Sequence, residues 1–257
     1  MPANKMNDMK KENVLLALFM FLTTALFAQT KTKIPYTQFW TSYSNQTRLS
    51  NKFGLWGDFH LRTKDHFFED LSSTIARVGV MYYLNDATKL TAGYAYITNY
   101  PLEGTLNINQ PEHRPWQQLQ WHTNYAKTKT MQWIRLEERY RRNIANDSML
   151  RSGTNFNFRV RYNIFYEIPF ASKNGTASKW SFFLNDELHI NLGKSIVYNY
   201  FDQNRFFVGF KYNVSKTDNI QFGYSNVFQQ LPAGNRYRNS QVLRVNYFQN
   251  LDLRKKK

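Results

Sequence analysis

Arginine and glutamate alternate with uncharged residues in several short segments of this 257-residue chain. Side chains two residues apart on a β-strand point to the same face, and neighbouring strands lie about 4.7–4.9 Å apart. Opposite charges on neighbouring strands can therefore pair, and arginine can also bind a carboxylate or phosphate through two parallel N–H groups. The candidate site is a lumen polar cluster made of the charges that share the inward face of these segments: Arg135, Glu137, Arg139, Arg159, Arg161, Glu187 and Arg205.

This charged cluster predicts one of two roles. Ion pairs between strands would form a structural polar plug, because a barrel of this size leaves modest interior space. Alternatively, the arginines would line a narrow, anion-preferring conduit. We favour the plug and keep the conduit as the second interpretation.

The histidines are the other residues that could do chemistry. Serine hydrolysis needs a base beside the hydroxyl and a third group that orients the base. The five histidines are scattered, and none stands in an H-x-S pair: His60, His66, His113, His122 and His189. His189 shares a strand face with Glu187, and His113 precedes Arg114 near a long loop, so either could join a site. We expect both to serve as hydrogen-bonding residues, predict no catalytic residue, and keep a lipid-modifying hydrolase as the alternative function.

No motif indicates a cofactor or a metal. The chain has no cysteine, which excludes disulfides, thiolate zinc sites and a thiol nucleophile. The run D-H-F-F-E-D at residues 65–70 gathers carboxylates and one histidine but lacks the regular ligand spacing of a calcium loop. No nucleotide-binding glycine pattern and no H-E-x-x-H pattern is present. We expect no cofactor and no metal, and we interpret residues 65–70 as a solvated turn.

The segment that positions the two central arginines has two distinct faces. Residues 155–166 read N-F-N-F-R-V-R-Y-N-I-F-Y, with Phe156, Phe158, Val160 and Ile164 on one parity. The other parity carries asparagines together with Arg159 and Arg161. The segment predicts a strand with one apolar and one charged face.

About eleven such two-faced segments follow one another, most of them 9–12 residues long. A tilted strand of that length crosses a bilayer, and the connections alternate between short turns and longer loops, as in outer-membrane barrels. The prediction is an all-β, transmembrane, antiparallel up-and-down β-barrel. Because bacterial barrels normally have an even number of strands, we expect about twelve, with Thr30–Tyr36 as a weak first strand, and keep ten as the alternative.

The beginning of the chain predicts export. Lys10 and Lys11 precede an apolar run, Val14–Ala28, that is shorter than the roughly 20 residues a membrane-spanning helix needs. Residues 1–28 therefore form a predicted signal peptide, with translation starting at Met1 or Met9, and residues 29–257 form the predicted barrel. A mean hydropathy of −0.61 excludes a bundle of membrane helices.

The net charge of +16 suggests an anionic partner, and position decides which. Loss of residues 1–28 removes three lysines and two acidic residues, so the exported chain keeps +15. Export argues against nucleic acid. We expect outer-membrane lipid and lipopolysaccharide as partners, contacted by basic loop and tail residues: Arg142, Arg151, Arg236, Arg238 and Lys255–Lys257.

A series of short motifs gives the chain a family resemblance. They are F-G-L-W-G-D-F-H-L-R (53–62), H-R-P-W-Q-Q-L (113–119), R-L-E-E-R-Y (135–140), F-R-V-R-Y (158–162), N-D-E (185–187), F-D-Q-N-R (201–205) and L-R-V-N-Y (243–247). In this order they resemble an uncharacterised outer-membrane β-barrel family common in Bacteroidetes, catalogued as domain of unknown function 2490. The resemblance implies an outer-membrane location in a Gram-negative bacterium and brings no established activity.

A soluble periplasmic barrel or sandwich remains the alternative fold. A lipocalin-like binder would also be exported but would bury its apolar face and expose its charged face. The number and length of the segments favour the membrane barrel. The predicted function is an outer-membrane barrel of unknown activity, structural or a narrow channel with a lumen lined by arginine and glutamate.

Overall fold

The structure, a computed structural model, describes residues 31–101, 107–171 and 178–254. The chain divides into two compact units, residues 1–32 and residues 33–257. The predicted signal peptide at residues 1–28 and the lysines at 255–257 lie outside the described residues. Within the described ranges, no helix is long and apolar enough to cross a membrane.

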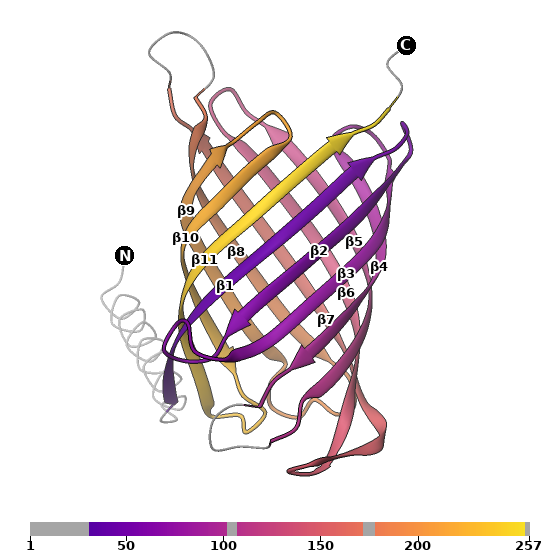
Figure 1. The fold of residues 1–257 in the computed structure, drawn as a ribbon, viewed down its shortest axis with the longest axis vertical. Coiled ribbons are helices and arrows are strands. Elements are labelled where there is room, and N and C mark those ends of the chain that lie inside the picture. The colour runs from indigo at the N-terminus through magenta and orange to yellow at the C-terminus, as the bar shows by residue number, and fades with distance from the viewer. Residues whose placement is uncertain (1–30, 102–106, 172–177, 255–257) are drawn as a thin grey trace, which may run out of the picture. The chain divides into compact units, whose positions relative to one another are not determined.

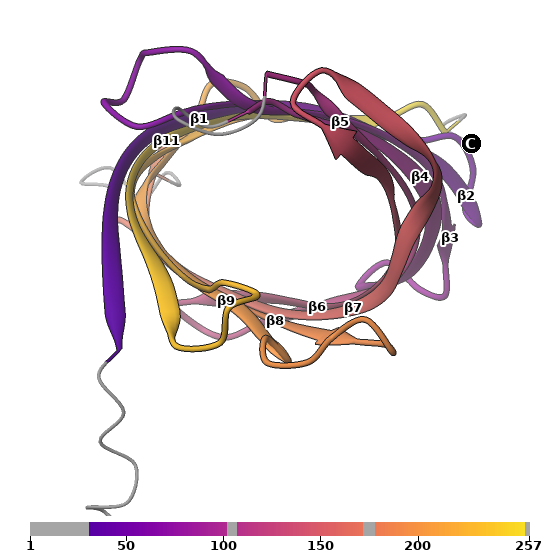
Figure 2. The ribbon, with the colours of Figure 1, turned by 90° about the horizontal axis from the view of Figure 1, so that it is seen from below.

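Eleven strands account for most of the described residues. They are β1 (Thr32–Arg48), β2 (Phe53–Thr63), β3 (Leu71–Tyr83), β4 (Thr88–Asn99), β5 (Gln110–Asn124), β6 (Lys129–Asn146), β7 (Met149–Pro169), β8 (Trp180–Leu192), β9 (Phe201–Asn213), β10 (Asp218–Gln230) and β11 (Arg236–Asp252). Each strand pairs with the next in antiparallel fashion, and β11 returns to β1, so the sheet closes into a barrel. Figure 1 shows the tilted strands, and Figure 2 shows the closed ring end on. The predicted antiparallel up-and-down barrel is confirmed.

The described barrel has eleven strands, close to the expected number of about twelve and between it and the alternative of ten. The segment expected as a separate first strand continues without a turn into the next, and both form β1. Pairing of β1 with β2 begins only at Trp40, so Pro35 lies outside that ladder and its missing N–H breaks no bond there.

The odd strand number makes the closing pair of strands parallel. β1 and β11 run in the same direction in Figure 1. Ser42 bonds Asn246, and three residues further on Asn45 bonds Gln249. The advance along both strands in the same sense is the signature of a parallel pair.

The connections differ between the two ends of the barrel. At the end where β1 and β11 finish, four connections span four residues each, at 49–52, 84–87, 125–128 and 214–217. Most connections at the other end are longer, as the alternation in the sequence predicts. The segment 142–153, which carries Arg142 and Arg151 of the expected basic loop residues, instead extends β6 and β7 into a long hairpin with a two-residue turn at 147–148. The register of that hairpin shifts after Arg142 and again after Ile144, which marks the irregular part.

The β2–β3 connection folds back on the first half of β1. The Asp65 carboxylate accepts hydrogen bonds from the backbone N–H and the hydroxyl of Thr37 and from the backbone N–H of His66. Partial burial raises the pKa of Asp65, but these hydrogen bonds outweigh it and hold that pKa below its ordinary value. Phe68 packs on Phe39 with ring centroids 4.9 Å apart. These hydrogen bonds and the ring contact hold the β2–β3 connection against β1.

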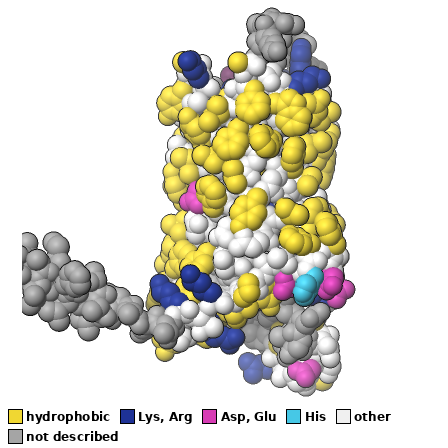
Figure 3. All heavy atoms as spheres, turned by 90° about the vertical axis from the view of Figure 1, so that its left-hand side faces the viewer, with side chains coloured by type: hydrophobic (Ala, Val, Ile, Leu, Met, Phe, Trp, Pro, Cys, Tyr) yellow, Lys and Arg dark blue, Asp and Glu magenta, His cyan; other side chains and the backbone are white. Residues whose placement is uncertain are grey.

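The outer face of the barrel is apolar. On β7 the outward side chains Phe158, Tyr162 and Ile164 are 37–39% exposed, and on β3 Val78 and Val80 are more than half exposed. Figure 3 shows hydrophobic side chains along the side of the barrel that lies at the left in Figure 1, with Lys and Arg gathered towards its two ends. The two faces predicted for residues 155–166 are thus oriented with the apolar face out.

The largest fully buried side chain of the interior, Trp116 on β5, packs on a pair of glycines. Gly79 and Gly93 stand opposite each other on β3 and β4. A methyl group at Gly93 would clash with the Val78 backbone oxygen and would lie 2.6 Å from a Trp116 ring carbon, both inside van der Waals contact. Glycine is needed there because the Val78 carbonyl and the indole occupy the space of a side chain.

Gly93→Ala is expected to destabilise the barrel by about 1–3 kcal/mol, because Trp116 must leave its place. The measurement is the urea midpoint of refolded protein in detergent. Gly57→Ala is the matched control, since a methyl group there meets nothing within 4 Å. Equal midpoints for the two variants would contradict the packing described.

Candidate functional site

Glu137 on β6 is the centre of a charged network on the inner face. It is 1% exposed. Arg159 donates from Nε and Nη2 to its Oε2 at 2.9 and 2.6 Å, and Arg161 donates from Nη1 to its Oε1 at 2.6 Å. Arg114 and Arg135 approach it at 3.3 and 3.9 Å. Four arginines from β5, β6 and β7 thus share one carboxylate.

The register of the strands explains these pairs. Glu137 stands directly opposite Arg159, and Glu187 stands opposite Arg205. Arg135 stands opposite Arg161, a pair of like charges. Arg161 turns away to donate to Glu187 at 2.7 Å, and the guanidinium of Arg135 lies over the Trp116 ring at 4.3 Å.

Two further carboxylates extend the network along β5 and β9. Glu112 accepts hydrogen bonds at 2.7 Å from both Arg114 and Arg139. Asp202 accepts one from Arg159 at 3.0 Å. Because Arg159 contacts both Glu137 and Asp202, the network reaches from β5 to β9 across the inner wall.

A smaller ion pair lies on β2 and β3. Asp58 stands opposite Arg77, which donates to it from Nε at 2.8 Å. His60 Nε2 lies 3.1 Å from the same carboxylate. These three side chains satisfy one another and add no net negative charge to the lumen.

Three arginines gather around Trp40 on β1. Their guanidinium carbons lie 4.0 Å (Arg62), 5.2 Å (Arg205) and 5.6 Å (Arg244) from the Trp40 ring centroid. Distances of this order are those of cation–π contacts. Arg244 also lies over Phe207 at 4.4 Å. This group, which we call the Trp40 cluster, faces the lumen from β1, β2, β9 and β11.

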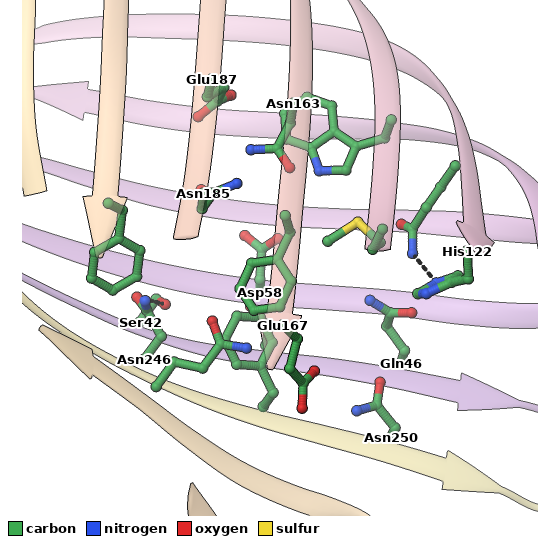
Figure 4. Close-up of a pocket in the computed structure, with 18 of the residues that line it drawn as sticks. Ser42, Gln46, Asp58, His122, Asn163, Glu167, Asn185, Glu187, Asn246 and Asn250 are labelled. Carbon is green, nitrogen blue, oxygen red and sulfur yellow. Dashed lines mark hydrogen bonds between the residues drawn. The ribbon is translucent and has the colours of Figure 1, made fainter. Parts of the chain in front are cut away.

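Two cavities occupy the lumen. The larger, about 720 Å³, is lined by nine Lys or Arg side chains and four carboxylates among the described residues. Figure 4 shows Asp58, Glu167 and Glu187 in it, on separate strands, with His122 at one side. The smaller, about 270 Å³, is lined by eight arginines and, in the described ranges, by no carboxylate. Four arginines line both cavities and form their boundary: Arg62, Arg77, Arg161 and Arg205.

The structure brings all seven residues of the predicted cluster to the inner face. Six of them are joined through Glu112, Glu137 and Glu187, and Arg135 is the most weakly paired. Several residues on the inner face were not part of the lumen polar cluster predicted from the sequence: Trp40, Asp58, Arg62, Arg77, Glu112, Arg114, Asp202 and Arg244.

The part of the site on β5 was not predicted because its segment contains two prolines. Pro111 and Pro115 suggest a loop, yet β5 begins at Gln110, and the pairing with β6 skips only Arg114 and Pro115. The alternation Glu112, Arg114, Trp116 in the sequence was the available signal.

The two histidines considered for catalysis lie on opposite faces of the barrel wall. His189 is fully buried, with Nε2 3.0 Å from Glu187 and Nδ1 3.3 Å from the Gln203 amide. His113 lies on the outer face, where its ring contacts Tyr96 at 5.4 Å and Nδ1 bonds the Tyr94 hydroxyl. They cannot belong to one site. In the part of the chain that the structure describes, no group of three or more His, Asp or Glu residues could hold a metal ion.

Fold and interior together define the class: a closed, mostly antiparallel β-barrel with an apolar outer face and an arginine-rich lumen. The chain belongs to the family described as "Protein of unknown function (DUF2490)", whose model matches residues 37–238. No match was found among curated proteins. Among solved structures, the chain is similar to one described as the NanC porin in a rhombohedral crystal form, with a TM-score of 0.41 and 12% identity. That similarity covers 71% of this chain and 78% of the other.

Glu137→Gln is expected to lower the unfolding free energy by about 3–5 kcal/mol, because four arginines lose their shared buried charge. The urea midpoint of the refolded protein measures the change. Glu138→Gln is the matched control: Glu138 is the next residue of β6, and its contact, with Gln117 at 3.4 Å, is on the exposed side. A similar decrease of the unfolding free energy in both variants would show that the charged network does not stabilise these strands.

Proposed function

We propose that this protein is an outer-membrane β-barrel that forms a narrow, anion-preferring conduit. The observation that carries the proposal is the boundary between the two cavities, where Arg62, Arg77, Arg161 and Arg205 line both sides. A solute that crossed the lumen would pass these guanidinium groups. Rings of arginine favour anions in pores.

The membrane location is supported by the outward side chains. A closed barrel pairs its backbone groups between strands, which is the condition for a sheet to stand in hydrocarbon. Exposed valine, leucine, phenylalanine and tyrosine cover the wall, and such an extended apolar surface would be unfavourable in water. The apolar N-terminal segment supports export to the outer membrane of a Gram-negative bacterium.

The anion preference is supported by the balance of charge in the lumen. The four carboxylates of the larger cavity are engaged: Asp58 by Arg77, Asp86 by Arg48, Glu167 by Lys211 and Glu187 by Arg161. Positive charge is therefore left over, in both cavities. In a lumen with low-dielectric walls this charge attracts anions and repels cations.

The narrowness is supported by the network itself. The interior charges that were expected to form a plug join the wall from β5 to β9, and the remaining space is divided into two cavities. The plug and the conduit are therefore not exclusive: the network fills part of the lumen, and the arginines at the boundary set which solutes pass.

The hydrolase alternative has no comparable support. A serine hydrolase needs a histidine beside a serine hydroxyl. The polar partners of His189 are Glu187 and Gln203, and those of His113 are tyrosines on the outer face. We therefore propose no catalytic activity.

Lipid and lipopolysaccharide are the partners that we propose for the ends of the barrel. Arg142 and Arg151 belong to the hairpin of β6 and β7, and Arg236 begins β11 at the same end. Phosphates of lipopolysaccharide would attract them. Arg238, which we grouped with them from the sequence, instead lies over the Tyr36 ring at 4.7 Å and lines the smaller cavity.

The membrane location predicts a heat-modifiable protein that fractionates with outer membrane. A folded barrel runs at a different apparent mass in a gel before and after boiling, because it resists detergent until heated. Immunoblots of separated membrane fractions, with and without boiling, measure this. A protein found in the soluble periplasmic fraction, with one mobility, would contradict the proposal.

The conduit predicts small, anion-preferring currents in planar bilayers. Arg159→Ala removes a cation from the smaller cavity and from the network, so the conductance should rise and the anion preference should fall roughly twofold or more. Arg151→Ala, the same substitution on the exposed hairpin, should leave both unchanged. A silent barrel, or one that prefers cations, would contradict the conduit.

A further inference from the structure

The Trp40 cluster stands at the boundary between the two cavities. Arg62 and Arg205 line both, Trp40 lines the smaller, and Arg244 lines the larger. All three guanidinium carbons lie within 5.6 Å of one ring centroid, although they come from β2, β9 and β11. Three separate strands thus bring positive charge to one point of the lumen.

Three buried polar atoms of this cluster are hydrogen-bond donors without acceptors, whereas Arg205 Nε donates to Gln203 Oε1 at 3.3 Å. Trp40 Nε1, Arg62 Nε and Arg244 Nε are buried, and none has a hydrogen-bond partner among the described residues. The Trp40 side chain itself is 7% exposed. A buried donor without an acceptor is costly, so an acceptor is the missing component of this cluster.

The charges around Arg62 increase that need. The charged side chains that act on it most strongly are all arginines: Arg205, Arg244, Arg77 and Arg161. The carboxylate that Arg205 approaches is Glu187, at 3.7 Å, and Glu187 already accepts a hydrogen bond from Arg161 at 2.7 Å. One carboxylate that is shared with Arg161 cannot neutralise all three arginines of the cluster. Water could accept the hydrogen bonds but would leave the charge repulsion in place.

We propose that Arg62, Arg205 and Arg244, gathered on Trp40, bind a small oxyanion: a carboxylate or phosphate group of a solute in the lumen. Two oxygens of such a group match the paired N–H donors of a guanidinium, and a further oxygen can accept from Trp40 Nε1. Chloride also accepts several hydrogen bonds but, as a single atom, cannot present two oxygens to the paired N–H donors of a guanidinium. The larger cavity, of about 720 Å³, leaves room for the rest of an organic anion.

This inference names the ligand class of the proposed conduit, and its biological use rests on that function. The binding itself does not require a membrane, because the site is built from strands of the barrel. It can be tested on the full-length protein refolded in detergent.

The test compares the apparent unfolding midpoint in sodium phosphate, sodium succinate and sodium chloride at equal ionic strength. At about ten times its dissociation constant, a bound oxyanion should raise the midpoint by roughly 3–6 °C. A raised midpoint with only one of the two oxyanions also supports the site and shows whether it prefers phosphate or carboxylate. Equal midpoints in all three salts would overturn it.

Arg62→Gln and Arg244→Gln separate a binding role from a structural one. Each substitution should abolish most of the shift in unfolding midpoint that the oxyanion causes. The midpoint in chloride should stay the same or rise, because one of the mutually repelling charges is gone. A structural role would instead lower the midpoint in chloride and keep the shift. Arg62→Lys retains the charge and loses the planar pair of donors, so it should fold and also lose most of the shift.

Arg238→Gln is the matched control, since it removes a lumen arginine that also lies over an aromatic ring. Its ring, Tyr36, is four residues from Trp40 on β1, about 13 Å away along the strand. The control should keep the oxyanion shift, and an equal loss would show diffuse lumen charge and overturn the specific site. Failure of the barrel to insert into membranes would contradict the proposed function, whereas an inserted barrel without an oxyanion response would contradict this inference alone.

Discussion

The shared carboxylate of Glu137 is the interaction on which the arrangement of the barrel depends. It joins β5, β6 and β7 from inside, and it is fixed by the same register that places Phe158 and Ile164 outside. A slip of one residue would turn Arg159 and Arg161 towards the outer face and the apolar side chains towards the lumen. The ion pairs and the apolar wall therefore specify the same register, and neither can change without the other.

The network also explains why the lumen is positive. Each of the six buried carboxylates of the interior has at least one cationic partner, and several have two or more. The arginines outnumber them, and three arginines contact the Trp40 ring. The ring can hold guanidinium groups in place but cannot neutralise them. This uncompensated positive charge is the basis of the conduit and of the anion site that we propose.

The sequence could predict the parts of the barrel that depend on local alternation. The two faces of residues 155–166 follow from a period of two, and Glu137 meets Arg159 because their strands are neighbours joined by one hairpin. The Trp40 cluster could not be predicted in this way. Trp40 and Arg244 are about 200 residues apart in the chain, and they meet only because β1 and β11 close the ring. Which parallel or antiparallel register closes a barrel is not encoded in either strand alone.

Prolines made the exact strand number and the β5 part of the site hard to predict. Pro35 precedes the first pair of the β1–β2 ladder, Pro111 precedes the first pair of the β5–β6 ladder, and that second ladder skips Pro115. Likewise, the polar hairpin at 142–153 reads as a loop, because its side chains lack the outward apolar face. Its backbone pairs all the same, so a pattern of side chains underestimates how far the strands extend.

The central claim is that the apolar face of each strand meets lipid while the charged face meets water in the lumen. The chain has no cysteine, so single cysteines introduced along β7 can be read without background. In reconstituted membranes, cysteines at Phe158, Tyr162 and Ile164 should resist a charged, membrane-impermeant maleimide, because hydrocarbon excludes the reagent and suppresses the reactive thiolate. A cysteine at Asn163, which lines the larger cavity, should react with it. Reaction of the three outward positions with the charged reagent would contradict the account.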